Sequence, residues 1–159
     1  MRKLSDKKLL AVMLLVSVVV FGSLAYSHCQ IPCGIYDDEA RFSTIAEHIT
    51  TIEKSIKQIE ALSAEKKVDM NQVVRWVNNK DQHADELSEI VTYYFMAQRI
   101  KLPAAGDTKA YNAYVGKLTL LHEMLVYAMK AKQTTDLANI DKLRAALEKF
   151  HAAYSADAG

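Results

Sequence analysis

The residues best suited to chemistry lie between positions 28 and 36, where one histidine and both cysteines of the chain occur together. The segment reads His28-Cys29-Gln30-Ile31-Pro32-Cys33-Gly34-Ile35-Tyr36. Cysteine binds metals as the thiolate, and a nearby cation or metal lowers the pKa of the thiol. Pro32 and Gly34 allow sharp backbone turns, so both sulfur atoms can approach one ion. The segment therefore predicts a compact metal site.

The residues before His28 have the three parts of a secretory signal peptide. Basic residues dominate the first eight positions, an uncharged and mostly apolar run covers residues 9–26, and Ala25-Tyr26-Ser27 ends the segment with a small-x-small pattern. This pattern predicts that signal peptidase removes residues 1–27 and that the protein is exported, to the periplasm or the cell exterior. The alternative is an uncut, membrane-anchored chain, because about 18 apolar residues can just span a bilayer.

Cleavage after Ser27 would give His28 a free α-amine beside its imidazole. The α-amine, the Cys29 amide nitrogen and the thiolates of Cys29 and Cys33 then form a set of two nitrogens and two sulfurs. Such a set in one plane suits Ni(II) or Cu(II), whereas tetrahedral zinc needs further side-chain ligands. An axial imidazole would favour a trivalent ion, so the set suggests a one-electron redox centre. A Cys29–Cys33 disulfide is the alternative, since cysteines of exported proteins commonly pair.

The rest of the chain, residues 37–159, predicts four helices. Apolar residues recur at steps of three and four, the spacing of an amphipathic helix. The expected elements are a helix from about Asp37, a link at 63–67, a helix from Asp69 to about Ile100, a break at 102–106, a helix after Asp107 and a helix after Asp136. Lys80 interrupts the apolar stripe of the second helix, whose middle should therefore not face a plain apolar core. The expected stripe of the third helix includes Tyr111, Tyr114 and Leu118. We expect an all-α fold, an up-down-up-down four-helix bundle with an N-terminal metal-binding hook.

Charge and composition exclude two other classes of protein. The whole chain has a formal net charge of +1, and removal of residues 1–27 leaves 16 basic against 18 acidic residues, a balance of −2. Nucleic-acid binding requires a concentrated basic face, which the sequence lacks. A di-iron bundle needs two Glu-x-x-His pairs and two further glutamates. Glu148 and His151 supply only one such pair, and His48, His122 and His151 are interpreted as ordinary helix histidines.

The order His-Cys-x-x-Pro-Cys-Gly-x-Tyr, placed directly after the expected cleavage site, resembles the nickel hook of nickel-containing superoxide dismutases. This resemblance implies a homohexamer of four-helix bundles with one nickel ion per subunit. It also implies that nickel cycles between Ni(II) and Ni(III) while superoxide is converted to dioxygen and hydrogen peroxide. His28, Cys29 and Cys33 are the implied metal ligands. Tyr36 resembles the tyrosine that lines the substrate channel, and Tyr94 resembles a second one.

Three positions depart from the pattern of that family. Gln30 replaces an aspartate, Ser43 replaces a glutamate and His83 replaces an arginine. In the family the glutamate and arginine orient the axial imidazole, a role of residues just outside the metal ligands. Glu47 and His83 are the candidates for orienting His28 in this chain. These departures leave one alternative function open, an exported nickel- or copper-binding protein without turnover.

Overall fold

The computed structural model describes residues 38–156, so the expected signal peptide at 1–27 and the hook at 28–36 lie outside it. The described elements are α2 (Asp38–Ser63), α3 (Met70–Glu89), the π-helical segment η1 (Ile90–Arg99), α4 (Thr108–Gln133) and α5 (Ala138–Ser155). Residues 38–156 contain no strand. The prediction of an all-helical chain is confirmed for these residues.

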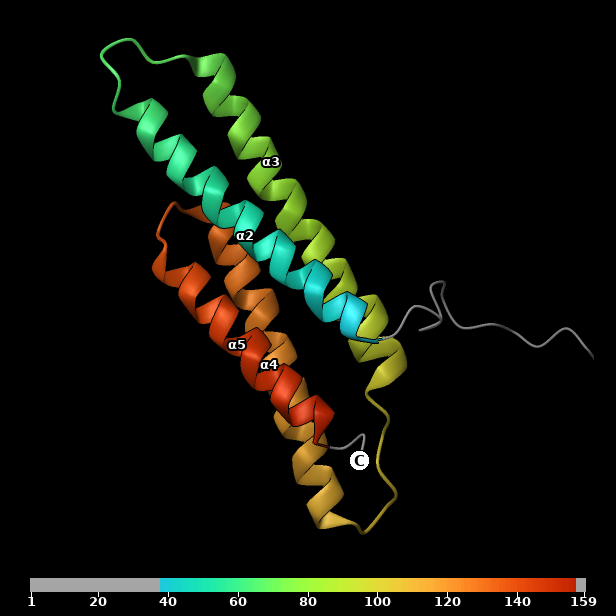
Figure 1. Ribbon diagram of the computed structural model, residues 1–159. Helices are drawn as coiled ribbons and strands as arrows, with labels where there is room; N and C mark the ends of the chain where they lie inside the picture. The colour runs from blue at the N-terminus through green and yellow to red at the C-terminus, as the bar shows by residue number, and fades with distance from the viewer. Residues whose placement is uncertain (1–37, 157–159) are drawn as a thin grey trace, which may run out of the picture. The chain divides into compact units, whose positions relative to one another are not determined.

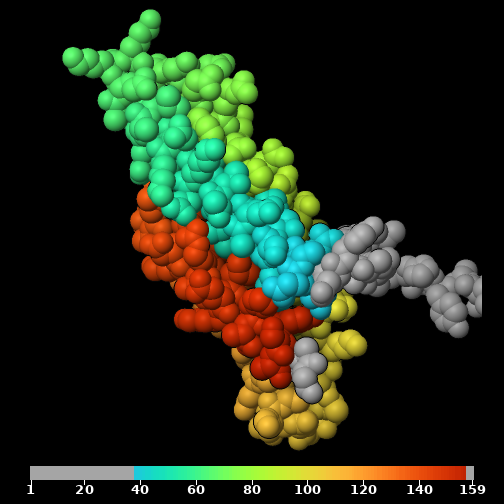
Figure 2. Space-filling model, viewed as in Figure 1, coloured from blue at the N-terminus to red at the C-terminus, as the bar shows by residue number. Residues whose placement is uncertain are grey.

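Successive helices run in opposite directions (Figure 1). α2 packs against α3 and α4 against α5, while α3 also contacts α4 and α2 also contacts α5. Figure 2 shows α2 and α5 side by side along one face. This arrangement is that of an up-down-up-down four-helix bundle. Within the described residues, none of the helices has the length and apolar character needed to span a membrane.

Two of the helices begin at the aspartates that the sequence indicated. The Asp69 carboxylate accepts hydrogen bonds from the backbone N–H groups of Asn71 and Gln72 at 3.1 and 3.2 Å. The Asp107 carboxylate accepts one from Ala110 at 2.9 Å. These bonds satisfy N–H groups that have no partner within the helix. The turn before Asp107 contains Gly106 at φ 91°, a left-handed conformation that glycine adopts without steric cost.

The core lies along the predicted apolar stripe of α2 and is closed by aromatic rings. The α2 isoleucines at 45, 49, 52 and 56 are at most 1% exposed. At one end of this stripe the Phe42 ring lies 4.9 Å from the Phe95 ring and 5.6 Å from the Phe150 ring, measured between centroids. Three helical elements, α2, η1 and α5, therefore meet in one aromatic cluster.

The predicted stripe of α4 is wrong in its first turns. Tyr111 is 54% exposed, Tyr114 and Leu118 are only partly buried, and the fully buried residues of α4 begin only at Leu121. The periodicity was real, but the first turns of α4 extend past the ends of the neighbouring helices (Figure 1). An amphipathic pattern shows which face is apolar; it does not show whether another helix is present to cover it.

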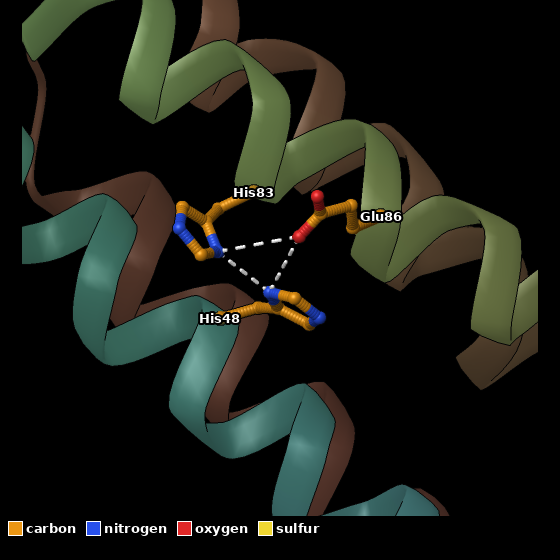
Figure 3. A group of neighbouring side chains, drawn as sticks. All are labelled: His48, His83 and Glu86. Carbon is orange, nitrogen blue, oxygen red and sulfur yellow. Dashed lines mark hydrogen bonds and ion pairs between the residues drawn. The ribbon is translucent and has the colours of Figure 1, made fainter.

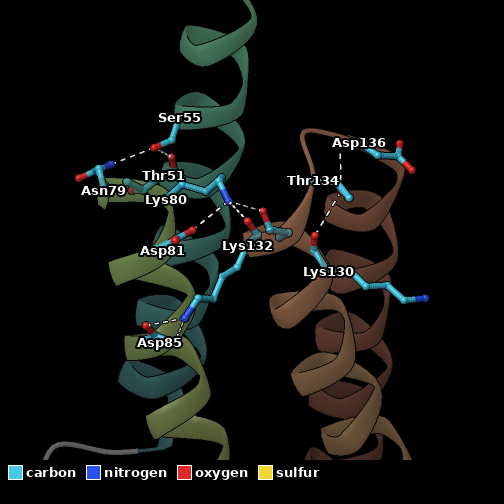
Figure 4. Close-up of polar contacts among 11 residues, drawn as sticks. Thr51, Ser55, Asn79, Lys80, Asp81, Asp85, Lys130, Lys132, Thr134 and Asp136 are labelled. Carbon is cyan, nitrogen blue, oxygen red and sulfur yellow. Dashed lines mark hydrogen bonds and ion pairs between the residues drawn. The ribbon is translucent and has the colours of Figure 1, made fainter. Parts of the chain in front are cut away.

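Lys80 confirms that the middle of α3 does not face a plain apolar core. Its side chain is 3% exposed, and its ammonium group donates to the carbonyls of Ala131 and Lys132 at 2.7 and 2.5 Å (Figure 4). A third bond, of 2.9 Å, goes to the Asp81 carboxylate. The two carbonyls belong to the last turn of α4, where backbone acceptors lack intrahelical partners and the helix dipole favours a cation. Lys80 therefore caps the C-terminus of α4.

The second helix was expected to continue to about Ile100, and it does so with a change of winding. Residues 90–99 form a π-helix, in which the Ile100 N–H bonds to the Phe95 carbonyl five residues back at 2.9 Å. Five residues of α-helix turn a side chain about 140° away from the starting direction. π-winding brings residues five apart back toward the same side. Tyr94 and Arg99 are related in this way.

Candidate functional site

The first residue of α2, Asp38, accepts hydrogen bonds from three side chains. One carboxylate oxygen accepts from the Tyr94 hydroxyl. The other accepts from the Arg99 guanidinium and the Tyr154 hydroxyl, each at 2.6 Å. These donors come from η1 and α5, so the start of α2 is held by two other elements. Tyr36, the last residue of the hook, precedes Asp38 by only two residues in the sequence.

The charges in this Asp38 cluster shift the ionisation of its members. Burial alone would raise the pKa of Asp38, but hydrogen bonds from Arg99, Tyr154 and Tyr94 outweigh burial and hold that pKa below its ordinary value. Burial and the bond to Asp38 raise the pKa of Tyr94 to about 12. Burial and Asp38 likewise raise the pKa of Tyr154. At neutral pH the cluster therefore contains an ionised carboxylate and two protonated tyrosines.

An open cleft beside the Asp38 cluster is lined by basic side chains. Its charged lining residues are Asp38, Asp107, Arg99, Lys101, Lys109 and Lys117. Four cations against two carboxylates make the cleft locally basic, although the whole chain is near neutral. Such a surface attracts small anions over a distance comparable to the Debye length.

A second group of polar side chains lies between α2 and α3. The Nδ1 atoms of His48 and His83 are 2.8 Å apart, and the Glu86 Oε2 atom lies 3.6 Å from each (Figure 3). All three atoms point toward one another. Burial, followed by the adjacent His83, lowers the pKa of His48. Two imidazoles and one carboxylate are together a common ligand set for a divalent transition metal.

The predicted site residues divide between described and undescribed parts of the chain. The metal ligands His28, Cys29 and Cys33, and the channel residue Tyr36, lie outside the described residues. Tyr94 is described, is 4% exposed and donates its hydroxyl hydrogen to Asp38. Ser43 and Glu47 are both exposed on α2, and the Glu47 charge acts to raise the pKa of His48, although burial and His83 outweigh it.

Sequence reasoning missed both clusters. His48 was interpreted as an ordinary helix histidine, and the His83-x-x-Glu86 spacing on α3 went unnoticed, although residues three apart share a helix face. That spacing was an available signal. The Asp38 cluster had no comparable signal, because its members are up to 116 positions apart in the sequence. His151 was also treated as ordinary, and it contacts the Glu39 carboxylate at 2.9 Å and stacks on Phe42.

The donor atoms available in the hook sequence can be compared with the ligands that nickel accepts. Two thiolates with an amine and an amide nitrogen provide the soft sulfur and planar nitrogen set that Ni(II) accepts. The residues present therefore fit nickel. A helical bundle preceded in the sequence by such potential donors is consistent with a redox metalloprotein.

Comparison with protein families identifies the family to which the chain belongs. The family model of nickel-containing superoxide dismutase matches residues 23–157, which is most of the chain. The chain therefore belongs to the nickel-containing superoxide dismutase family, and it is an oxidoreductase with nickel as its cofactor. Comparison with curated proteins and with solved structures returned no match.

Proposed function

We propose that the protein is exported, that signal peptidase cuts after Ser27, and that the new terminus holds one nickel ion per subunit. His28 would supply its α-amine and imidazole, Cys29 its amide nitrogen and thiolate, and Cys33 its thiolate. The observation that carries the proposal is the motif at residues 28–36, which falls within the family match. An uncut chain has no α-amine at His28, so cleavage would be required for activity.

The proposed reaction converts two superoxide anions and two protons into dioxygen and hydrogen peroxide. His28, Cys29 and Cys33 would hold the nickel, which would supply the one-electron Ni(II)/Ni(III) chemistry. Tyr36 would order the incoming anion and water by hydrogen bonding. The cations of the basic cleft, Lys101 and Lys109 among them, would raise the local concentration of the anion.

The geometry of Tyr94 supports a positioning role in the proposed substrate channel. The Tyr94 hydroxyl donates a hydrogen bond to Asp38. With a pKa of about 12, this hydroxyl keeps its proton at neutral pH. Of the two tyrosines, Tyr36 is therefore the one we propose to contact substrate. Tyr94 would fix the start of α2, from which the hook extends by sequence.

We propose the homohexamer as the working assembly. Support comes from large apolar side chains left exposed where helices project beyond their neighbours. These residues are Val68, Met70 and Val74 near the start of α3, and Leu102, Tyr111 and Val115 near the start of α4. Exposed apolar side chains gathered at each of these two places are available for subunit contacts.

The decisive experiment combines three measurements on the secreted protein. N-terminal sequencing should give histidine in the first cycle, metal analysis should give one nickel per subunit, and pulse radiolysis should show catalytic loss of superoxide. Cys29→Ser and Cys33→Ser should each lose nickel and activity. Full activity in either variant, or an intact Met1 terminus in the active protein, would refute the proposed hook.

A further inference from the structure

Three potential ligand atoms in the α2–α3 interface surround a common point. The His48 Nδ1, His83 Nδ1 and Glu86 Oε2 atoms form a triangle with sides of 2.8, 3.6 and 3.6 Å. The point equidistant from the corners of this triangle lies about 2.0 Å from each, which is the length of Zn–N and Zn–O bonds. The side lengths also bracket the separation of about 3.3 Å between two ligands of a tetrahedral ion at that bond length.

Hydrogen bonding alone does not explain this arrangement. At 3.6 Å the Glu86 oxygen is too far from either imidazole nitrogen for a hydrogen bond. Only the two histidines are bonded to each other. A hydrogen bond between the two imidazoles would not require a third group. The Glu86 oxygen nevertheless lies at the same distance from both nitrogen atoms. All three atoms therefore converge on one position.

The carboxylate is held in this orientation by its helix neighbour. Gln82 Nε2 donates to the Glu86 Oε1 atom at 2.8 Å. The bond occupies one carboxylate oxygen and leaves the other, Oε2, directed at the histidines. Metal-binding carboxylates commonly have such a partner outside the coordination sphere, and loss of that partner weakens metal affinity.

The site is also accessible and partly shielded. The side chains of His48, His83 and Glu86 are 12, 26 and 40% exposed. The histidines therefore lie toward the interior, while the carboxylate lies on the solvent side, where an ion can enter. Three protein ligands leave a fourth position for water, as in zinc sites of the two-histidine, one-carboxylate type.

We propose that His48, His83 and Glu86 form a second metal site that binds a divalent first-row ion such as zinc between α2 and α3. This site shares no residue with the hook. It has two nitrogen ligands and one oxygen ligand and no sulfur, a set that suits zinc and differs from the sulfur-containing set of the hook. Because its ligands come from two helices, a bound ion crosslinks them and stabilises their pairing.

The test is a zinc titration of the full mature protein with nickel already bound. Zinc should bind at one equivalent per subunit beyond the nickel, and it should raise the thermal unfolding midpoint. X-ray absorption at the zinc edge should show nitrogen and oxygen neighbours at about 2.0–2.1 Å and no sulfur at about 2.3 Å. Sulfur at the longer distance would place zinc in the hook and overturn the proposal.

Variants separate this site from other binding. His48→Gln and His83→Gln should each lose the zinc equivalent while remaining helical, whereas His122→Gln, at an exposed position on α4, should retain it. Gln82→Ala should weaken zinc binding by about 10–100-fold through Glu86 alone. Equal zinc binding in His48→Gln and the unaltered protein would overturn the proposal.

A hook variant distinguishes failure of this site from failure of the proposed function. Cys29→Ser should lose nickel and still bind one zinc with nitrogen and oxygen neighbours only. Loss of zinc together with nickel in that variant would show that the zinc had been in the hook.

Discussion

Lys80 allows the sharpest test of how the bundle is held together. Its ammonium group is buried and serves two backbone carbonyls at the end of α4 (Figure 4). We consider the substitution Lys80→Met, which keeps an unbranched apolar stem of similar length and removes the ammonium group. The carbonyls of Ala131 and Lys132 would then lose this donor.

The expected cost follows from those two carbonyls. A buried acceptor that loses its partner costs about 1–3 kcal/mol. Relief from burying the ammonium charge offsets part of the total, because burial of a charge opposes folding. We therefore expect Lys80→Met to lower the free energy of unfolding by about 3 kcal/mol. Urea unfolding at fixed protein concentration measures this loss. The slope of the free energy of unfolding against urea concentration should be unchanged.

Lys132→Met is the matched control. Lys132 lies on the last turn of α4, the turn that Lys80 caps. Its ammonium group pairs with the Asp85 carboxylate at 2.6 and 2.8 Å, but both side chains are substantially exposed. Exposed ion pairs contribute about 0–1 kcal/mol. The two substitutions thus remove the same functional group from a buried and an exposed position. Equal losses of stability would refute the capping role of Lys80.

Four further outcomes follow from the Asp38 cluster and the exposed surfaces. Asp38→Asn should cost about 2 kcal/mol at pH 7. Folding holds the pKa of Asp38 below its unfolded value of about 3.9. The stabilisation by the ionised carboxylate is therefore complete above about pH 3.9 and is lost as pH falls through the folded pKa. The urea midpoints of the variant and the parent protein should accordingly converge in acid. Tyr94→Phe should cost about 1 kcal/mol and move the acid loss of stability to higher pH, since Asp38 loses one donor; an unchanged acid profile would contradict this. If the proposed homohexamer uses this surface, Tyr111→Arg should keep full helicity by circular dichroism and reduce the mass found by light scattering, and an unaltered mass would exclude this surface from the assembly. Lys101→Glu should lower kcat/KM and weaken its dependence on salt, and no change would exclude steering by the cleft.

The parts of the fold that the sequence predicted are those determined by local chemistry. Helices were expected to start at Asp69 and after Asp107, and both carboxylates do cap a helix, because a carboxylate just before an amphipathic run has N–H groups within reach. The α2 stripe of isoleucines was expected in the core because its period matches the helix. Lys80 was recognised as an interruption of a stripe, although its partner at the end of α4 was not foreseeable.

The parts that could not be predicted depend on contacts between distant residues. Tyr111 has the right helical phase to be buried, and it is exposed because none of the helices within residues 38–156 covers the first turns of α4. The π-winding of residues 90–99 has no signature in composition or period, since it depends on what Tyr94 and Arg99 contact. Two members of the triad, His83 and Glu86, were recognisable from their i, i+3 spacing on α3. Its third member required knowing which face of α2 meets α3.

The Asp38 cluster holds the first residue of α2, which follows the hook by two positions in the sequence. Tyr94 and Arg99 reach Asp38 from the π-helical segment, and Tyr154 reaches it from the end of α5. Each donor depends on its own helix being packed against the aromatic core. Asp38, two positions after the last hook residue in the sequence, is therefore fixed only when the helices are assembled. In the proposed hook only residues near a free terminus hold the nickel, so we infer that the precision of this site depends on the Asp38 cluster. Tyr154→Phe should then broaden the nickel electron paramagnetic resonance signal at full nickel content, whereas an identical signal would mean that the hook is positioned without the cluster.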